Sequence, residues 1–195
     1  MEYGPNTALI VVDVQNDFAD PSGNLYVPGG EEAIGFINQQ IADAVSAGST
    51  VVYTQDWHPE TTPHFEKDGG IWPVHCVGGT PGAELHPDLD VADDAVRLRK
   101  GSGGEDGYSA FHVRDPETGE ESSTGLAKEL EDRGVQQMVV VGLALDYCVK
   151  ETAIDGARAG FDTILLAEGT RAVNLSPGDG TRAAADLAEA GVDIV

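Results

Sequence analysis

Short runs of apolar residues recur along the chain with the composition of buried parallel strands. The runs are continuous rather than alternating, which is typical of strands that are covered on both faces of a sheet. Six such segments are the predicted strands: Ala8 to Val12, Thr50 to Tyr53, Ala95 to Leu98, Gln137 to Val141, Thr163 to Leu166 and Val192 to Val195.

The segments between the predicted strands place apolar residues at helical spacing. Strands that alternate with helices predict βαβ units with right-handed crossovers. We therefore predict an α/β fold, with three α/β/α layers around a mostly parallel six-stranded sheet, in a single domain over residues 1–195. The first predicted helix carries the apolar stripe Ile34, Ile37, Ile41 and Val45 and ends before Gly48. The second contains Leu126 and Leu130 and follows the N-cap candidates Ser122 and Ser123. The third and fourth cover Val149 to Ala157 and Ala183 to Ala188.

Two stretches lack this periodicity. The first, residues 56–94, is too long for an ordinary connection, which indicates a functional loop. The second, residues 101–123, is rich in Gly, Ser and acidic residues, and its part 114–123 is expected to be an insertion on the surface.

The charge of the chain excludes two classes of partner. It has 34 acidic and 11 basic side chains, a formal net charge of −23, which repels nucleic acid and anionic membranes. No apolar stretch is long enough to cross a bilayer, and no apolar leader precedes the first strand. The two cysteines form no CxxC pair, which favours a reducing compartment. We expect a cytoplasmic protein without nucleic-acid or membrane partners.

Polar residues follow four of the predicted strands at their carboxyl ends. These residues are Asp13, Asp56, Lys100 and Cys148. Ligands of open α/β sheets bind outside the carboxyl ends of the strands, so these side chains are expected to meet at one edge. Polar residues also occupy strand ends for structural reasons, and the prediction therefore depends on their occurring together.

Cys148 is the candidate nucleophile. It follows the strand that ends near Val141 and opens a helical pattern. Free N–H groups and the helix dipole at such a position lower the pKa of a thiol and could hold an oxyanion. Asp13 could take the thiol proton and later protonate departing ammonia, and Lys100 could stabilise both anions. The alternative is structural: a packed thiol, a capping aspartate and a solvated lysine.

The loop after the second strand carries potential metal ligands. Asp56, His58, His64 and His75 lie within 20 residues of one another, and three of the chain's five histidines are among them. This donor set suits one divalent ion, with Zn²⁺ ahead of Fe²⁺ or Mn²⁺. The alternative is a set of loop histidines that titrate in solvent. His86 and His112 are interpreted as structural, and Cys76 as a packed thiol.

Six motifs in this order resemble the nicotinamidase branch of the isochorismatase-like cysteine hydrolases, over nearly the whole chain. They are Asp13-Val14-Gln15-Asn16-Asp17-Phe18, Asp56-x-His58, Trp72-Pro73-x-His75-Cys76, Lys100-Gly101, Tyr108-Ser109-Ala110-Phe111 and Gly142-Leu143-Ala144-x-Asp146-x-Cys148-Val149. The resemblance implies hydrolysis of nicotinamide to nicotinate and ammonia in NAD salvage, with pyrazinamide as a second substrate and no organic cofactor.

The resemblance also implies roles for individual residues. Asp13, Lys100 and Cys148 would form a triad that acts through a thioester, and the metal would coordinate the pyridine nitrogen. The N–H groups of Ala144 and Cys148 would form the oxyanion hole, next to a cis peptide between Leu143 and Ala144. The substrate pocket would be lined by Phe18, Trp72, Tyr108, Leu143 and Tyr147.

Two other functions remain open from the sequence. A relative of the same superfamily could act on another small amide, such as a carbamoyl or ureido compound. A binding protein could also keep the fold without its chemistry. Whether the chain forms a homo-oligomer is left open as well.

Overall fold

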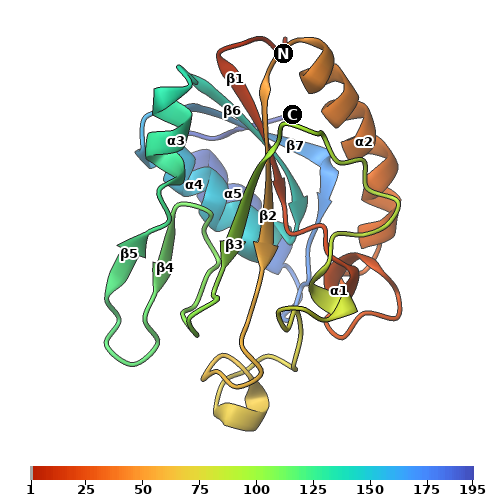
Figure 1. The fold of residues 1–195 in the computed structure, drawn as a ribbon, viewed down its shortest axis with the longest axis vertical. Helices are drawn as coiled ribbons and strands as arrows, with labels where there is room; N and C mark the ends of the chain where they lie inside the picture. Colours follow the sequence, from red (N-terminus) through yellow and green to blue (C-terminus); the bar gives the residue numbers. More distant parts are fainter. Residues whose placement is uncertain (1) are drawn as a thin grey trace.

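The centre of the molecule is a six-stranded parallel sheet with the strand order β3-β2-β1-β6-β7-β8. The structure is a computed structural model that describes residues 2–195. Figure 1 shows the strands side by side, with their carboxyl ends at the end of the molecule opposite the chain termini. The strands are β1 (Thr7–Val12), β2 (Thr50–Asp56), β3 (Val96–Lys100), β6 (Gln137–Leu143), β7 (Asp162–Arg171) and β8 (Asp193–Ile194).

Helices cover both faces of the sheet, which gives the three layers predicted from the sequence (Figure 1). Two short 3₁₀ turns, η1 (Glu66–Asp68) and η2 (Pro81–Ala83), lie in the long loop between β2 and β3. One face carries α1 (Asn16–Ala19) and α2 (Gly30–Ser46), and the other carries α3 (Leu126–Asp132), α4 (Lys150–Arg158) and α5 (Asp179–Glu189).

The side chains of β1 show why these layers form. All six residues of the strand are buried. Leu9 and Val11 pack with the apolar stripe of α2, whereas Ile10 and Val12 pack with α3, α4 and α5. Successive side chains of a strand point to opposite faces, so a strand without polar positions requires cover on both sides. The continuous apolar runs of the sequence are explained by this arrangement.

The strand order reverses between β1 and β6. From β1 the chain adds β2 and β3 on one side, and then returns to place β6 on the other side of β1. Such a reversal opens a crevice at the carboxyl ends of the two strands, where α/β proteins bind their ligands. Asp13 directly follows β1, and the turn that carries Cys148 follows β6.

Close contact between β1 and β6 makes Gly142 indispensable. Its φ is +114°, and a Cβ at this position would lie 2.1 Å from the carbonyl oxygen of Val12. Left-handed strain and overpacking each cost about 1 to 3 kcal/mol, so we expect Gly142→Ala to lower the free energy of unfolding by about 2 to 6 kcal/mol. Denaturant unfolding tests this. Gly35→Ala, on α2 with no atom within 4 Å of the new Cβ, should instead be neutral or stabilising by up to about 1 kcal/mol.

The predicted strands and helices are confirmed, with shifts of one to three residues at most strand ends and two larger differences. β7 continues to Arg171, five residues beyond its predicted end, after a register shift opposite β6. Ser122 and Ser123 are not N-caps: they belong to β5 (Glu121–Ser123), which pairs with β4 (His112–Arg114) in a two-stranded hairpin. The N-cap of α3 is Gly125. Within residues 2–195, none of the helices combines the length and the apolar character that crossing a membrane requires.

Candidate active site and metal centre

Asp13, Lys100 and Cys148 meet at the carboxyl edge of the sheet. Lys100 ends β3, and its Nζ lies 2.8 Å from Oδ2 of Asp13 and 3.8 Å from Sγ of Cys148. Asp13 follows β1 in the left-handed conformation, which aspartate tolerates better than most residues. Its other oxygen accepts a hydrogen bond of 2.6 Å from the Thr54 hydroxyl. The three side chains are held in place, and all three residues are buried.

Cys148 lies in a single π turn, η3 (Leu145–Val149), which leads directly into α4. The peptide bond between Leu143 and Ala144 immediately before this turn is cis, as the sequence resemblance implies. Asp146 fixes the turn from behind, since its two carboxylate oxygens accept hydrogen bonds from the backbone N–H groups of Val173 and Asn174. These two hydrogen bonds join the turn that carries Cys148 to the segment directly after β7.

Burial and the neighbouring charges together set the protonation of the three groups. Burial raises the pKa of Asp13, although the ammonium of Lys100 acts against it. Burial acts to lower the pKa of Lys100, but Asp13 and Asp56 outweigh it and hold that pKa well above the ordinary value. A carboxyl with a raised pKa beside a permanently charged ammonium is suited to accept and return a proton.

The expectation of a lowered thiol pKa was wrong for the free protein. Burial raises the pKa of Cys148 well above its ordinary value, and Lys100 offsets this only in part. The helix dipole at this position favours the thiolate, but removal of the thiol from water disfavours the thiolate more strongly. The thiol of this candidate nucleophile is therefore neutral at rest, and its activation would require a neighbouring base.

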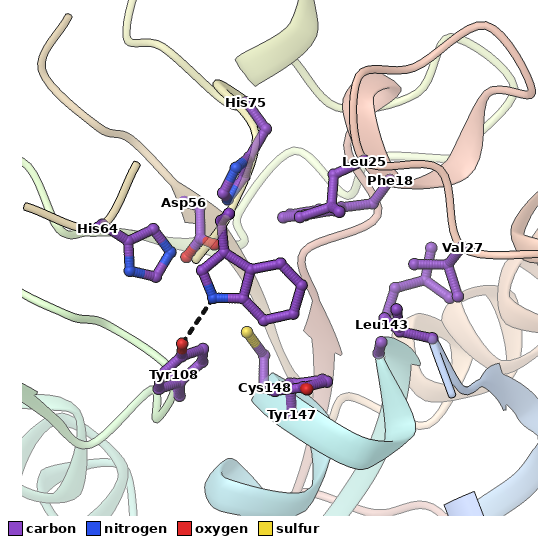
Figure 2. A pocket seen from close by; sticks show the side chains of 13 residues that line it. Phe18, Leu25, Val27, Asp56, His64, His75, Tyr108, Leu143, Tyr147 and Cys148 are labelled. Atoms are coloured by element: carbon purple, nitrogen blue, oxygen red, sulfur yellow. Dashed lines mark hydrogen bonds between the residues drawn. The ribbon is translucent and has the colours of Figure 1, made fainter. Parts of the chain in front are cut away.

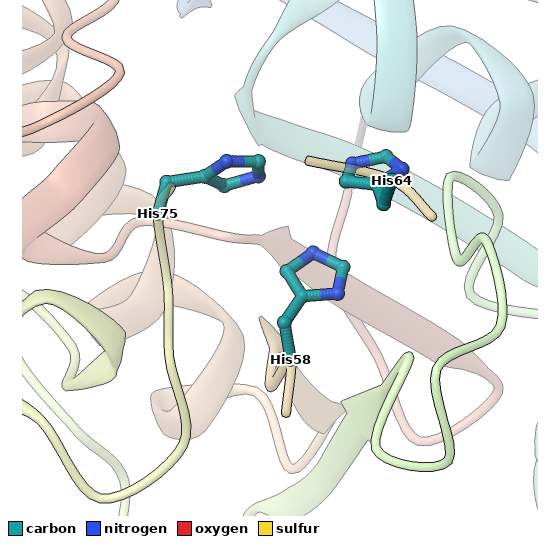
Figure 3. A group of neighbouring side chains, drawn as sticks. All are labelled: His58, His64 and His75. Carbon is teal, nitrogen blue, oxygen red and sulfur yellow. The ribbon is translucent and has the colours of Figure 1, made fainter. Parts of the chain in front are cut away.

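Three histidines form a second cluster beside the triad. Their ring nitrogens include one from each of His58, His64 and His75 that all lie within 4.8 Å of one another, and all three residues are buried. Figure 3 shows the three rings around a common centre. Backbone hydrogen bonds hold the loop in this shape, because the N–H of His58 donates to Cys76 and the N–H of Trp72 donates to His64.

The hydrogen bonds of these rings fit a metal ion. Both ring nitrogens of His58 are buried without a hydrogen-bond partner among residues 2–195. The Nδ1 atoms of His64 and His75 are engaged by Asp106 and by the carbonyl of Pro73, each at 2.7 Å. A ligating histidine uses one nitrogen for the metal and donates the other N–H to an oxygen, which is the pattern seen at His64 and His75.

The pKa shifts of two of the rings also favour metal binding. Burial lowers the pKa of His64 and lowers that of His75 to about 4. At neutral pH both rings are therefore uncharged, which is the form that binds metal. Among the described residues, the three histidines have the donor set and the spacing that a divalent cation requires, and His64 and His75 also have the required protonation.

Asp56 connects the two clusters. It ends β2, one of its oxygens accepts a hydrogen bond of 2.6 Å from Lys100, and the other lies 3.7 Å from Nε2 of His58. Burial acts to raise its pKa, but Lys100 and His58 outweigh this and hold it below the ordinary value. Gln15 fixes the backbone of Asp56 through two hydrogen bonds of 2.8 Å. An ionised carboxylate is thus held between the lysine and the histidines.

A narrow pocket opens onto both clusters. Figure 2 shows the Cys148 sulfur directed into the space between the lining side chains. That space measures about 350 Å³ including the solvent at its mouth. Trp72 donates a hydrogen bond of 2.8 Å to the Tyr108 hydroxyl, and both rings pack against Tyr147. The result is a slot with flat aromatic walls.

A comparison with protein-family models decides the family. The model described as the isochorismatase domain matches residues 7–194. The chain belongs to the isochorismatase family. The sequence resemblance is confirmed at this level, and so is the fold that it implies.

Similar proteins of the family are nicotinamidases and pyrazinamidases. A nicotinamidase of Acinetobacter baylyi is 39% identical over 193 residues, which cover 90% of this chain and 86% of the relative. The crystal structure of the Pyrococcus horikoshii pyrazinamidase in complex with zinc has a TM-score of 0.87 and 38% identity, covering 98% and 99% of the two chains. The structure of PnC1 from L. infantum in complex with nicotinate has a TM-score of 0.89 and 38% identity, covering 100% and 95%.

The structure of this isochorismatase-family protein brings the predicted site residues together. The five residues expected in the pocket all line it: Phe18, Trp72, Tyr108, Leu143 and Tyr147. Ala144 and Cys148 line it as well, and their part in an oxyanion hole stays a prediction. Cys76 and His86 lie outside the pocket lining and are buried, whereas His112 is half-buried and faces Asp155 at 3.1 Å.

Sequence reasoning missed four residues of the site. Leu25, Val27 and Val173 line the pocket, and Asp106 contacts His64. Val173 follows the carboxyl end of β7, so the strand-end rule would have found it if the strand had been predicted at its full length. The other three lie in loops without a periodic signal.

Proposed function

We propose that this isochorismatase-family protein hydrolyses nicotinamide to nicotinate and ammonia in NAD salvage, and that it also accepts pyrazinamide. One observation carries the proposal: the thiol of a buried thiol–carboxylate–ammonium group and two members of a three-histidine cluster line the same aromatic slot. Two similar proteins, one named a pyrazinamidase and one solved in complex with nicotinate, support the same ring chemistry. The cytoplasm is the expected compartment.

The reaction begins with the neutral thiol of Cys148. Asp13 accepts the thiol proton while Sγ forms a bond to the carboxamide carbon, and Lys100 stabilises the negative charges that meet there. Asp13 then donates that proton to the amide nitrogen, the C–N bond breaks and ammonia leaves a thioester on Cys148. Water, deprotonated by Asp13, adds to the thioester, the C–S bond breaks, and nicotinate is released with the thiol restored.

A divalent cation would be held by His58, His64 and His75 with Asp56, and zinc is the ion we propose. When bound, such a cation supplies a Lewis acid that can hold the ring nitrogen of the substrate. The protein itself contributes the slot: Trp72, Tyr108 and Tyr147 form its aromatic walls and exclude water from the thiol. Orientation of the carboxamide over Sγ is the expected result.

Ammonia release from a panel of amides tests the proposed function. Zinc-loaded protein should cleave nicotinamide and pyrazinamide, and it should cleave benzamide at least about 100-fold more slowly, because benzamide has the same shape but no ring nitrogen to hold. Preferred cleavage of an aliphatic carbamoyl or ureido amide would support the alternative substrate class instead. Release from none of these amides would contradict an amidase function.

Metal removal gives a second prediction. Dialysis against a chelator should reduce kcat/KM for nicotinamide by at least about 100-fold, because the positioning of the ring is lost, and stoichiometric Zn²⁺ should restore it. Dialysis without chelator is the control. Full activity of protein shown by elemental analysis to contain no metal would contradict the metal dependence.

A further inference from the structure

His64 is the one member of the histidine cluster whose ring donates to a carboxylate outside the cluster. Its Nδ1 lies 2.7 Å from Oδ1 of Asp106. A carboxylate only accepts hydrogen bonds, so Nδ1 of His64 carries the proton and Nε2 keeps a free lone pair. His75 is fixed in a similar way, but by the carbonyl of Pro73 only two residues away. Asp106 is 42 residues from His64, so this contact joins two separate loops.

The main chain of Asp106 is itself held rigidly. Its N–H donates to the carbonyl of Arg114 and its carbonyl accepts from the N–H of Arg114, both at 2.8 Å. Arg114 ends β4, which pairs with β5 across three residue pairs. The stretch 114–123, expected from the sequence to be a surface insertion, therefore continues the ladder that anchors Asp106.

A further contact aligns the same two loops. The Thr62 hydroxyl donates to the carbonyl of Gly104 at 3.1 Å, and it accepts a hydrogen bond from the N–H of His64 at 3.3 Å. His64 is thus fixed at its backbone through Thr62 and at its ring through Asp106. The side chain of Asp106 is about one-third exposed and that of His64 is buried, so the contact closes one side of the cluster.

We propose that Asp106 is a positioning residue of the metal centre, supported by the β4–β5 hairpin, and that it fixes the ring orientation and tautomer with which His64 binds the cation. This inference rests on the metal centre of the proposed function. Carboxylates that orient metal-binding histidines typically contribute 10- to 100-fold to metal affinity. Asp106 is not among the residues that line the slot and contacts that lining through His64, so its effect is expected on metal binding first.

Metal affinity tests this inference without any substrate. The Zn²⁺ affinity of Asp106→Ala, measured by competition with a chromogenic chelator, should be about 10- to 100-fold weaker than that of the wild type. Asp106→Asn keeps an oxygen that can accept from Nδ1 and should lose less affinity. Glu105→Gln removes the same charge from the same loop while keeping an acceptor for Gly103, and it should bind like the wild type.

Three results separate the possibilities. Thermal unfolding of metal-free Asp106→Ala should match that of the metal-free wild type, and the visible spectrum of bound Co²⁺ should change in this variant alone. Wild-type affinity and an unchanged Co²⁺ spectrum in Asp106→Ala would overturn the positioning role and leave the proposed function intact. A wild-type protein that binds neither Zn²⁺ nor Co²⁺ would overturn the metal centre itself, and this inference with it.

Discussion

Cys148→Ala is expected to lose at least about 10⁴-fold in kcat for nicotinamide, because among the described residues Cys148 supplies the one thiol that lines the slot and could form the proposed thioester. Sγ of Cys148 is the thiol that points into the slot, and it lies 3.8 Å from the ammonium of Lys100. The variant keeps the slot walls and the histidines, so it should still bind metal. Ammonia release by metal-loaded protein measures the loss.

Cys76→Ala is the matched control for this experiment. Cys76 is also a buried free thiol, but it faces the carbonyl of Gly82 rather than the slot. Its substitution should leave kcat within about threefold of the wild type, at the cost of a small cavity. Equal activity of Cys148→Ala and the wild type would contradict the nucleophile, and equal losses in both variants would indicate general damage to the fold.

Lys100→Met is expected to be the most destabilising change at the site. Nζ of Lys100 bonds both Asp13 and Asp56, and all three residues are buried. Removal of one partner from a buried ionic group typically costs about 3 to 5 kcal/mol, because charge is left without compensation. Loss of the ammonium should also lower kcat by about 100- to 1,000-fold, as with other charge-stabilising groups. Denaturant unfolding and ammonia release measure the two effects.

Two further variants show whether the loss of stability comes from the buried charges. Lys128→Met breaks an exposed ion pair with Asp132 and should cost only about 0.3 to 0.5 kcal/mol. Combining Lys100→Met with Asp13→Asn and Asp56→Asn removes the stranded charges, and it should recover part of the stability without recovering activity. If Lys100→Met were as stable as the wild type, Lys100 could not be compensating these two carboxylates.

Hydrophobic pattern alone predicted the layers and most strand positions. Each strand of a doubly covered parallel sheet needs apolar side chains on both faces, so its run is visible without any knowledge of its neighbours. β7 was predicted too short because Ala167, Glu168 and Gly169 interrupt the run, while its pairing with β6 resumes beyond them. That continuation is decided by the neighbouring strand, which local sequence does not reveal.

The chemistry of the site was visible for a related reason. Polar residues directly after apolar strands must emerge at one edge, and Asp13, Asp56 and Lys100 do so. Quantities that depend on the surroundings were not visible. The raised thiol pKa of Cys148 follows from burial. Ser123 belongs to a hairpin because it pairs with His112, which lies far from it in the local sequence pattern. No sequence pattern marked Asp106 as a site residue, because the loop contains several acidic residues and nothing in the sequence distinguishes this one.

Partitioning of the acyl group between water and hydroxylamine tests the central claim most directly. If nicotinamide passes through a thioester on Cys148, ammonia leaves before the second nucleophile acts. Rising hydroxylamine should then convert the product from nicotinate to the hydroxamate while ammonia release still equals the sum of both products. Formation of nicotinate alone at every hydroxylamine concentration, with ammonia released as before, would contradict a covalent route through the thiol.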